Sequence, residues 1–113
     1  MALFAFAAAL AAQTITVEPG TPPEVATAFE AWAGCVMERV EQDDGEGSAQ
    51  RAAAAIVAAC EDRQRALSAA HDRWVDAQPI SASAKRDARR NMARSVAQLR
   101  GQIARMIRSM RED

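Results

Sequence analysis

The sequence predicts an all-α protein, an antiparallel helical hairpin followed by a third, basic helix in an arrangement like a three-helix bundle. Large apolar residues recur every three or four positions in three successive segments, which places them on one face of a helix. Turn-forming residues separate these segments, and the only two cysteines lie symmetrically about the first turn. With 113 residues, the chain is expected to form one domain.

Residues 1–12, MALFAFAAALAA, form an uncharged apolar run that ends in small residues. The run is too short for a membrane-spanning helix, which needs about 20 apolar residues. Its tripeptide ALA at 9–11 fits the cleavage pattern of a secretory signal, although no basic residue precedes the apolar run. We therefore expect a signal peptide over 1–12, cleaved after Ala11 or Ala12. The alternative is a buried, alanine-rich first helix.

The helical domain is expected over residues 21–113, after a flexible tail at 13–20. The first helix is predicted over 22–42, because Thr21 can cap it, Glu24 occupies the capping-box position and prolines suit a first helical turn. One apolar stripe runs along this helix: Val25, Phe29, Trp32, Val36 and Val40.

Two further helices follow, over 49–77 and 83–111. The first helix ends at the glycine-containing turn DDGEGS, whose Ser48 caps the second helix, and Pro79 ends the second helix. The second helix carries Ala53, Ile56, Cys60, Leu67 and Trp74 on its apolar stripe. The third carries a heptad-like seam typical of a coiled coil: Met92, Val96, Leu99, Ile103, Met106 and Met110.

Cys35 and Cys60 are equidistant from the turn between the first two helices, so an antiparallel hairpin places them opposite each other. The same register aligns the two apolar stripes, pairing Phe29 with Leu67 and Val40 with Ile56. We predict a disulfide, which closes a loop of 26 residues and stabilises the fold by about 3.5 kcal/mol. A disulfide indicates an oxidising compartment, here the periplasm or the exterior. Free buried thiols, a redox pair and a metal site with His71 are the alternatives.

The sequence contains no motif for covalent catalysis, metalloprotease chemistry or phosphate binding. We therefore predict no enzyme activity, no catalytic residue, no cofactor, no metal site and no small-molecule substrate. His71, the only histidine, is interpreted as a surface group beside Asp72. The seam methionines Met92, Met106 and Met110 are interpreted as core residues, with a soft-metal face as the alternative.

Charge is unevenly distributed along the chain. Residues 18–47 hold eight acids and one arginine, whereas residues 85–111 hold nine basic residues and one acid. In a three-helix bundle the first and third helices would be neighbours and would attract each other weakly. The alternative is that the third helix presents arginines to a protein partner or to a second copy of the chain, and the predicted partner-binding residues are Arg89, Arg90, Arg94, Arg105 and Arg108.

Nucleic acid is not expected as a partner, because an exported protein rarely meets it and no aromatic side chain lies among these arginines to stack on bases. A membrane surface is not expected either, because the third helix lacks Trp and Phe anchors.

Trp32-x-x-Cys35-Val36 and the segment AAAAIVAAC at 52–60 resemble small exported proteins of Gram-negative bacteria built as disulfide-stapled helical hairpins. The resemblance implies a fold and a periplasmic location but no active residues. We expect a non-enzymatic periplasmic protein that acts through protein contacts, including self-association through the third helix. The alternative is a metal-handling or envelope-stress-sensing protein that uses Met106, Met110, His71 and the thiols. A third hypothesis is an enzyme inhibitor that inserts its 43–47 loop into a basic cleft.

Overall fold

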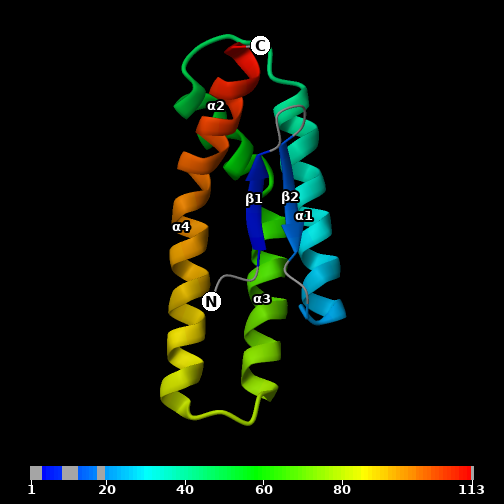
Figure 1. The fold of residues 1–113 in the computed structure, drawn as a ribbon, viewed down its shortest axis with the longest axis vertical. Coiled ribbons are helices and arrows are strands. Elements are labelled where there is room, and N and C mark those ends of the chain that lie inside the picture. Colours follow the sequence, from blue (N-terminus) through cyan, green and yellow to red (C-terminus); the bar gives the residue numbers. More distant parts are fainter. Residues whose placement is uncertain (1–3, 9–12, 18–19, 113) are drawn as a thin grey trace.

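The computed structural model describes residues 4–8, 13–17 and 20–112 of the chain. Four helices carry the described fold: α1 (Pro23–Glu41), α2 (Ala49–Ala59), α3 (Glu61–Ala77) and α4 (Ala82–Glu112). A short hairpin of two strands, β1 (Phe4–Ala8) and β2 (Gln13–Val17), precedes them (Figure 1). The predicted all-α class is confirmed, because the helices alone form the described core.

Helix α1 begins one residue later than expected, with Pro22 at the N-cap position and Pro23 in its first turn. All five residues of its predicted apolar stripe are buried, which confirms the face assigned from the spacing. The core of the bundle also contains Ala33 and Cys35 from this helix.

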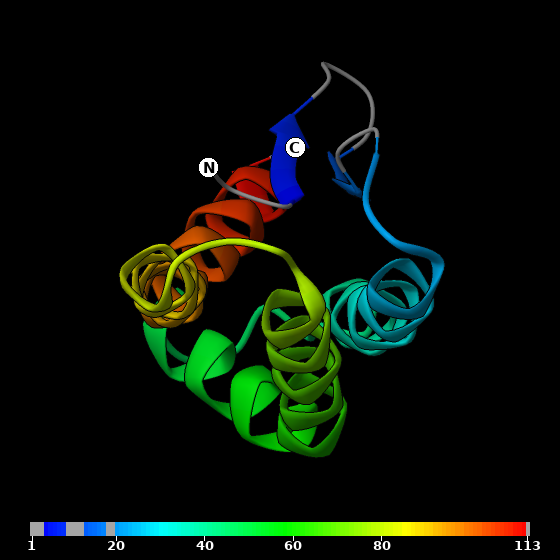
Figure 2. The same cartoon turned by 90° about the horizontal axis from the view of Figure 1, so that it is seen from below.

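The single helix expected over 49–77 is wrong: the chain forms two helices that meet at Cys60. This residue has φ −103° and ψ 13°, and it is both the C-cap of α2 and the N-cap of α3. The two helices leave this point in different directions (Figure 2). Helix α3 packs mainly on α1, whereas α2 packs mainly on α4. One straight helix could not cover both neighbours, so tertiary packing sets the break at a position without Gly or Pro.

Helix α4 agrees with its expected bounds within one residue at each end. The Ser81 hydroxyl accepts a hydrogen bond from the amide of Ala84 at 3.0 Å and so caps it. The seam is only partly correct: Met110 is 41 % exposed, while Ala104 and Ile107, which lie outside the seam, are buried. Because α4 contacts both α2 and α3, its buried face is wider than that of a two-stranded coiled coil.

Helices α1 and α4 lie on opposite flanks of the body over most of their length, with α3 between them on one side (Figures 1 and 2). The expectation that these two helices are neighbours in the bundle is therefore wrong. The break at Cys60 explains this arrangement, because it sends α2 across to α4 and separates α4 from α1. The acidic helix α1 and the basic helix α4 consequently lie on opposite flanks of the body.

The β1–β2 hairpin is antiparallel, with Phe4 opposite Val17 and Ala8 opposite Gln13. It lies beside the upper half of the body (Figure 1), between α1 and α4 and away from α3 (Figure 2). We expected a flexible tail over 13–20, but its residues 14–17, TITV, are β-branched and favour a strand. The alternative of a first helix within 1–12 is also wrong for residues 4–8. The expected cleavage site at Ala11 or Ala12 lies outside the described residues.

No helix in the described part of the chain combines the length and the apolar character that a membrane span requires.

Candidate protein-binding surface

The predicted disulfide between Cys35 and Cys60 is confirmed, with the two Cα atoms 6.0 Å apart. It joins the middle of α1 to the junction of α2 and α3, and Cys60 is 1 % exposed. The two sulfur atoms are bonded to each other, so neither cysteine is a free thiol in this oxidised form. The bridge thus fixes α1 against the point where the chain changes direction.

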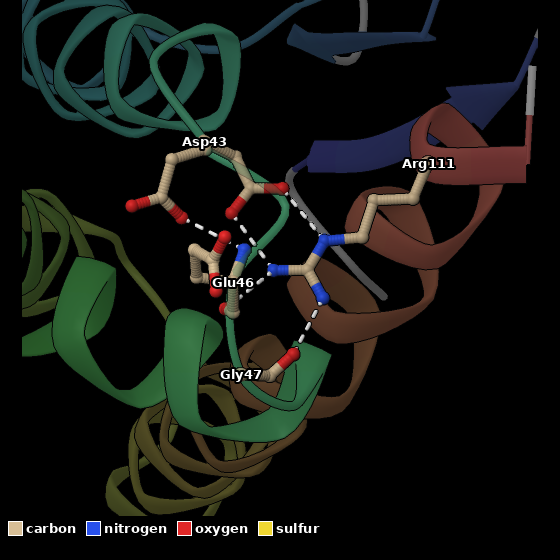
Figure 3. A network of polar contacts seen from close by, with 5 residues as sticks. Asp43, Glu46, Gly47 and Arg111 are labelled. Carbon is tan, nitrogen blue, oxygen red and sulfur yellow. Dashed lines mark hydrogen bonds and ion pairs between the residues drawn. The ribbon is translucent and has the colours of Figure 1, made fainter.

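A second fastening, which the sequence did not predict, closes the end of the bundle that carries the 43–48 turn. The guanidinium of Arg111 donates from Nε to Asp43 Oδ2 at 2.8 Å and from Nη2 to Asp43 Oδ1 at 2.9 Å (Figure 3). It also donates to the main-chain oxygens of Gly47 at 2.8 Å and Glu46 at 3.1 Å. We call these contacts the Arg111 clamp. They hold the last turn of α4 against the connection between α1 and α2.

The clamp perturbs both of its charged groups. The hydrogen bonds to Arg111 lower the pKa of Asp43 below its ordinary value of 3.8, and the same bonds raise the pKa of Arg111. A bidentate arginine–carboxylate pair is geometrically specific as well as strong. Because Asp43 is occupied by Arg111, the 43–47 loop offers Asp44 and Glu46 as its exposed acids. The inhibitor hypothesis needs the acids of this loop to be available to a basic cleft, and Asp43 is already bound to Arg111.

All five arginines predicted to bind a partner are exposed, but two of them have partners within the chain. Arg89 pairs with Asp76 of α3, and Arg90 lies 3.5 Å from Asp87, one turn earlier on α4. The remaining three, Arg94, Arg105 and Arg108, make no ion pair with any residue that the structure describes.

Four of these arginines share one side of α4. At 100° per residue, Arg90, Arg94, Arg105 and Arg108 fall within about 60° of one another, nearly opposite the buried Leu99, Ile103 and Met106. We call these four residues the arginine face. Ala97 and Gly101 lie between its two halves and are exposed. A Cβ atom added at Gly101 would meet only the Arg105 guanidinium, at 3.7 Å, so nothing inside the described protein requires a glycine there.

The opposite flank of the molecule is acidic. Glu30, Glu38 and Glu41 lie on the outward side of α1, are exposed and make no ion pair with a described residue. We call these three residues the acidic face. An open groove of about 550 Å³ runs beside it, lined by Glu30, Ala31, Gly34, Cys35, Glu38, Arg39, Gln42 and Arg63. The two arginines in the groove partly offset its negative charge.

The interpretation of His71 as a surface group is wrong, because this side chain is 4 % exposed. It shares a face of α3 with the buried Leu67 and Val75, four residues away on either side, and this spacing is the signal that could have placed it in the core. Its Nδ1 atom has no hydrogen-bond partner among the described residues and lies 3.9 Å from Asp72 Oδ1. Burial lowers the pKa of His71 below 6.5, and Asp72 opposes that shift only in part.

The residues of the metal-binding alternative do not converge. His71 lies about 16 Å along α3 from Cys60, towards the α3–α4 turn. Met106 is buried and Met110 is exposed, and both lie near the Arg111 clamp at the other end of the body. In the described ranges, no three His, Cys, Asp or Glu side chains are grouped so as to hold a metal ion.

Comparison of the chain with protein-family models, with curated proteins and with solved structures finds no match. The chain is a small all-α protein that is stapled by one disulfide, with an acidic and a basic flank on opposite sides.

Proposed function

We propose that this is a non-enzymatic protein of the periplasm that acts by binding an acidic protein surface through the arginine face of α4. The observation that carries the proposal is the exposure of Arg94, Arg105 and Arg108 on one side of the helix without ion pairs to described residues. Arginine suits such a role because its planar guanidinium binds carboxylates through two parallel hydrogen bonds.

The location rests on the disulfide and the N-terminal apolar run. Disulfides form and persist in oxidising compartments such as the periplasm. Signal cleavage after Ala11 or Ala12 would remove β1 and leave β2 without its strand partner, while the four helices and the disulfide would stay intact. The mature protein would then present the helical body, with both charged flanks.

Charge reversal on α4 tests the proposal. The variant Arg94→Glu, Arg105→Glu, Arg108→Glu should fold normally, since these side chains are exposed and lack ion pairs with described residues. A photo-crosslinker placed at Ala97 should capture an acidic protein from the envelope of the organism that makes this chain. The triple variant should lose that crosslink.

The control with the same change in charge reverses three exposed arginines of α2 and α3, Arg51, Arg63 and Arg65, of which Arg65 pairs with Glu61 on its own helix, and it should keep the crosslink. A crosslinker at the exposed Ala58 of α2 should capture nothing specific. An identical set of crosslinked proteins from wild type and from the α4 triple variant would remove the arginine face as the binding surface.

A further inference from the structure

We infer that the partner of the arginine face is the acidic face of α1 in a second copy of this protein, so that copies join side by side in an open array. The inference rests on the proposed function, because it names the occupant of the arginine face. It is carried by the match between the two charged faces in spacing, direction and height.

The spacing of the charges is the same on both faces. Arg94 and Arg105 are eleven residues apart on α4, and Glu30 and Glu41 are eleven residues apart on α1. Eleven residues span about 16 Å and make three turns plus about 20°, so the two members of each pair point in nearly the same direction. All four side chains are exposed and free of ion pairs to described residues. Two arginines can therefore meet two glutamates at once.

Small residues between the charges permit close approach. Ala31 and Gly34 lie between the two glutamates on α1, and Ala97 and Gly101 lie between the two arginines on α4. A side chain added at Gly34 would meet nothing within 4 Å, so the surface is open there. The small residues set how near the helices can come, whereas the charges select which faces meet.

The faces also match in direction and height. Both helices run from the lower to the upper end of the body (Figure 1). Arg111 of α4 and Asp43, just after α1, differ by 68 in residue number. Because they are in contact, they lie at about the same height along the long axis of the body. The pairs Glu30–Arg94 and Glu41–Arg105 differ by 64 in number (94 − 30 and 105 − 41). A neighbour displaced sideways and shifted by four residues, about 6 Å along the helix, therefore forms both pairs.

The two faces cannot satisfy each other within one molecule, because α1 and α4, which carry them, lie on opposite flanks of the body (Figure 2). A contact between two different faces related by translation does not close on itself, so it produces an open array rather than a dimer. Each exposed ion pair is weak, so the array should form only at high protein concentration and low ionic strength.

Sedimentation velocity on the full oxidised chain tests the inference. Wild type should show species larger than a monomer that grow with concentration in about 20 mM salt and disappear in about 500 mM salt. The variant Arg94→Glu, Arg105→Glu and the variant Glu30→Arg, Glu41→Arg should each be monomeric alone. An equimolar mixture of the two variants should associate again, because each then offers a face that complements the other.

The control Arg51→Glu, Arg65→Glu carries the same change in charge as the α4 variant and should associate like wild type. Wild type that stays monomeric up to its solubility limit in low salt would overturn the inference, and so would a mixture that does not associate. If the arginine face still captures a different acidic protein in that case, the proposed function stands and only the identity of the partner is wrong. Salt-sensitive binding to anionic lipid vesicles without self-association would likewise exclude a second copy as the partner.

Discussion

In the half of the body that carries the 43–48 turn, the Cys35–Cys60 disulfide joins α1 to the junction of α2 and α3, and the Arg111 clamp joins α4 to the turn that follows α1. At the opposite end, where α3 turns into α4, the described polar links between helices are two exposed ion pairs, Glu24 with Arg73 and Asp76 with Arg89, and a hydrogen bond that Lys85 Nζ donates to the main-chain oxygen of Asp76 at 2.7 Å. That end also buries His71, whose Nδ1 has no hydrogen-bond partner among the described residues. The covalent link and the bidentate arginine link are therefore concentrated in one half of the body, and the Arg111 clamp there fixes the relative height of the two charged flanks.

Among the changes considered, removal of the disulfide should lower the free energy of unfolding the most. The variant Cys35→Ala, Cys60→Ala loses the constraint on a 26-residue loop, which lowers the free energy of unfolding by about 3.5 kcal/mol. Urea denaturation followed by circular dichroism measures the loss. An unchanged unfolding midpoint would mean that the bridge is not what holds this end together.

Arg111→Met should have the next largest effect. It removes both hydrogen bonds to Asp43 and both bonds to the main chain of the turn, while it keeps the aliphatic stem of the side chain. We expect a lower unfolding midpoint than wild type and faster amide exchange in residues 43–48. The control Arg108→Met removes an exposed arginine without an ion pair to a described residue and should leave the exchange of the turn unchanged.

The contributions of the two ends to stability should also change over different ranges of pH. The folded state lowers the pKa of His71, so the unfolded chain takes up this proton first as the pH falls below about 6.5. The contribution of neutral His71 is therefore complete above that pH and is lost as the pH falls towards the lower folded pKa. Stability measured between pH 7.5 and 5.5 should decline in wild type and decline less in His71→Leu. Equal slopes would contradict a buried, neutral His71.

Asp43 should act in a more acidic range. Its pKa is lowered in the folded state, so its contribution is complete above the unfolded value of 3.8 and is lost as the pH falls through the folded pKa. In Arg111→Met this acidic loss should be smaller, because the clamp that lowers the pKa is gone. Titration of the Asp43 carboxyl by NMR in both proteins checks the difference. A pKa that is the same in both would show that the clamp does not form in solution.

The smallest effect is expected for the ion pairs at the lower end. Arg73→Ala breaks the pair with Glu24, which is exposed, and such pairs contribute about 0.2–1 kcal/mol. Arg89→Ala should act similarly. A double-mutant cycle at each pair measures the coupling, and a coupling as large as the loss from removing the disulfide would reverse the contrast between the two ends.

The sequence was sufficient for features that depend on local periodicity. The stripe of α1 and the equidistant cysteines predicted the helix face and the disulfide correctly, because spacing along one helix and symmetry about one turn determine both. The exposure of Arg90, Arg94, Arg105 and Arg108 also followed from their place opposite the seam of α4.

Features that depend on contacts between distant segments could not be predicted in this way. The break at Cys60 has no Gly or Pro to signal it and depends on where α4 packs. The Arg111 clamp joins residues that are 68 apart in the sequence. No local pattern in the sequence distinguishes Arg111 from the other arginines. His71 is the instructive failure, because residue type suggested the surface whereas its spacing from Leu67 and Val75 indicated the core.

The most direct test of the stapled helical body is intact mass spectrometry, without reductant and after alkylation, of the protein isolated from the cell envelope. We expect the mass of the chain that begins at Ala12 or Gln13, less two hydrogens for the disulfide and with no alkyl group added. Uncleaved protein that carries two alkylated cysteines would contradict both the covalent staple and the exported location.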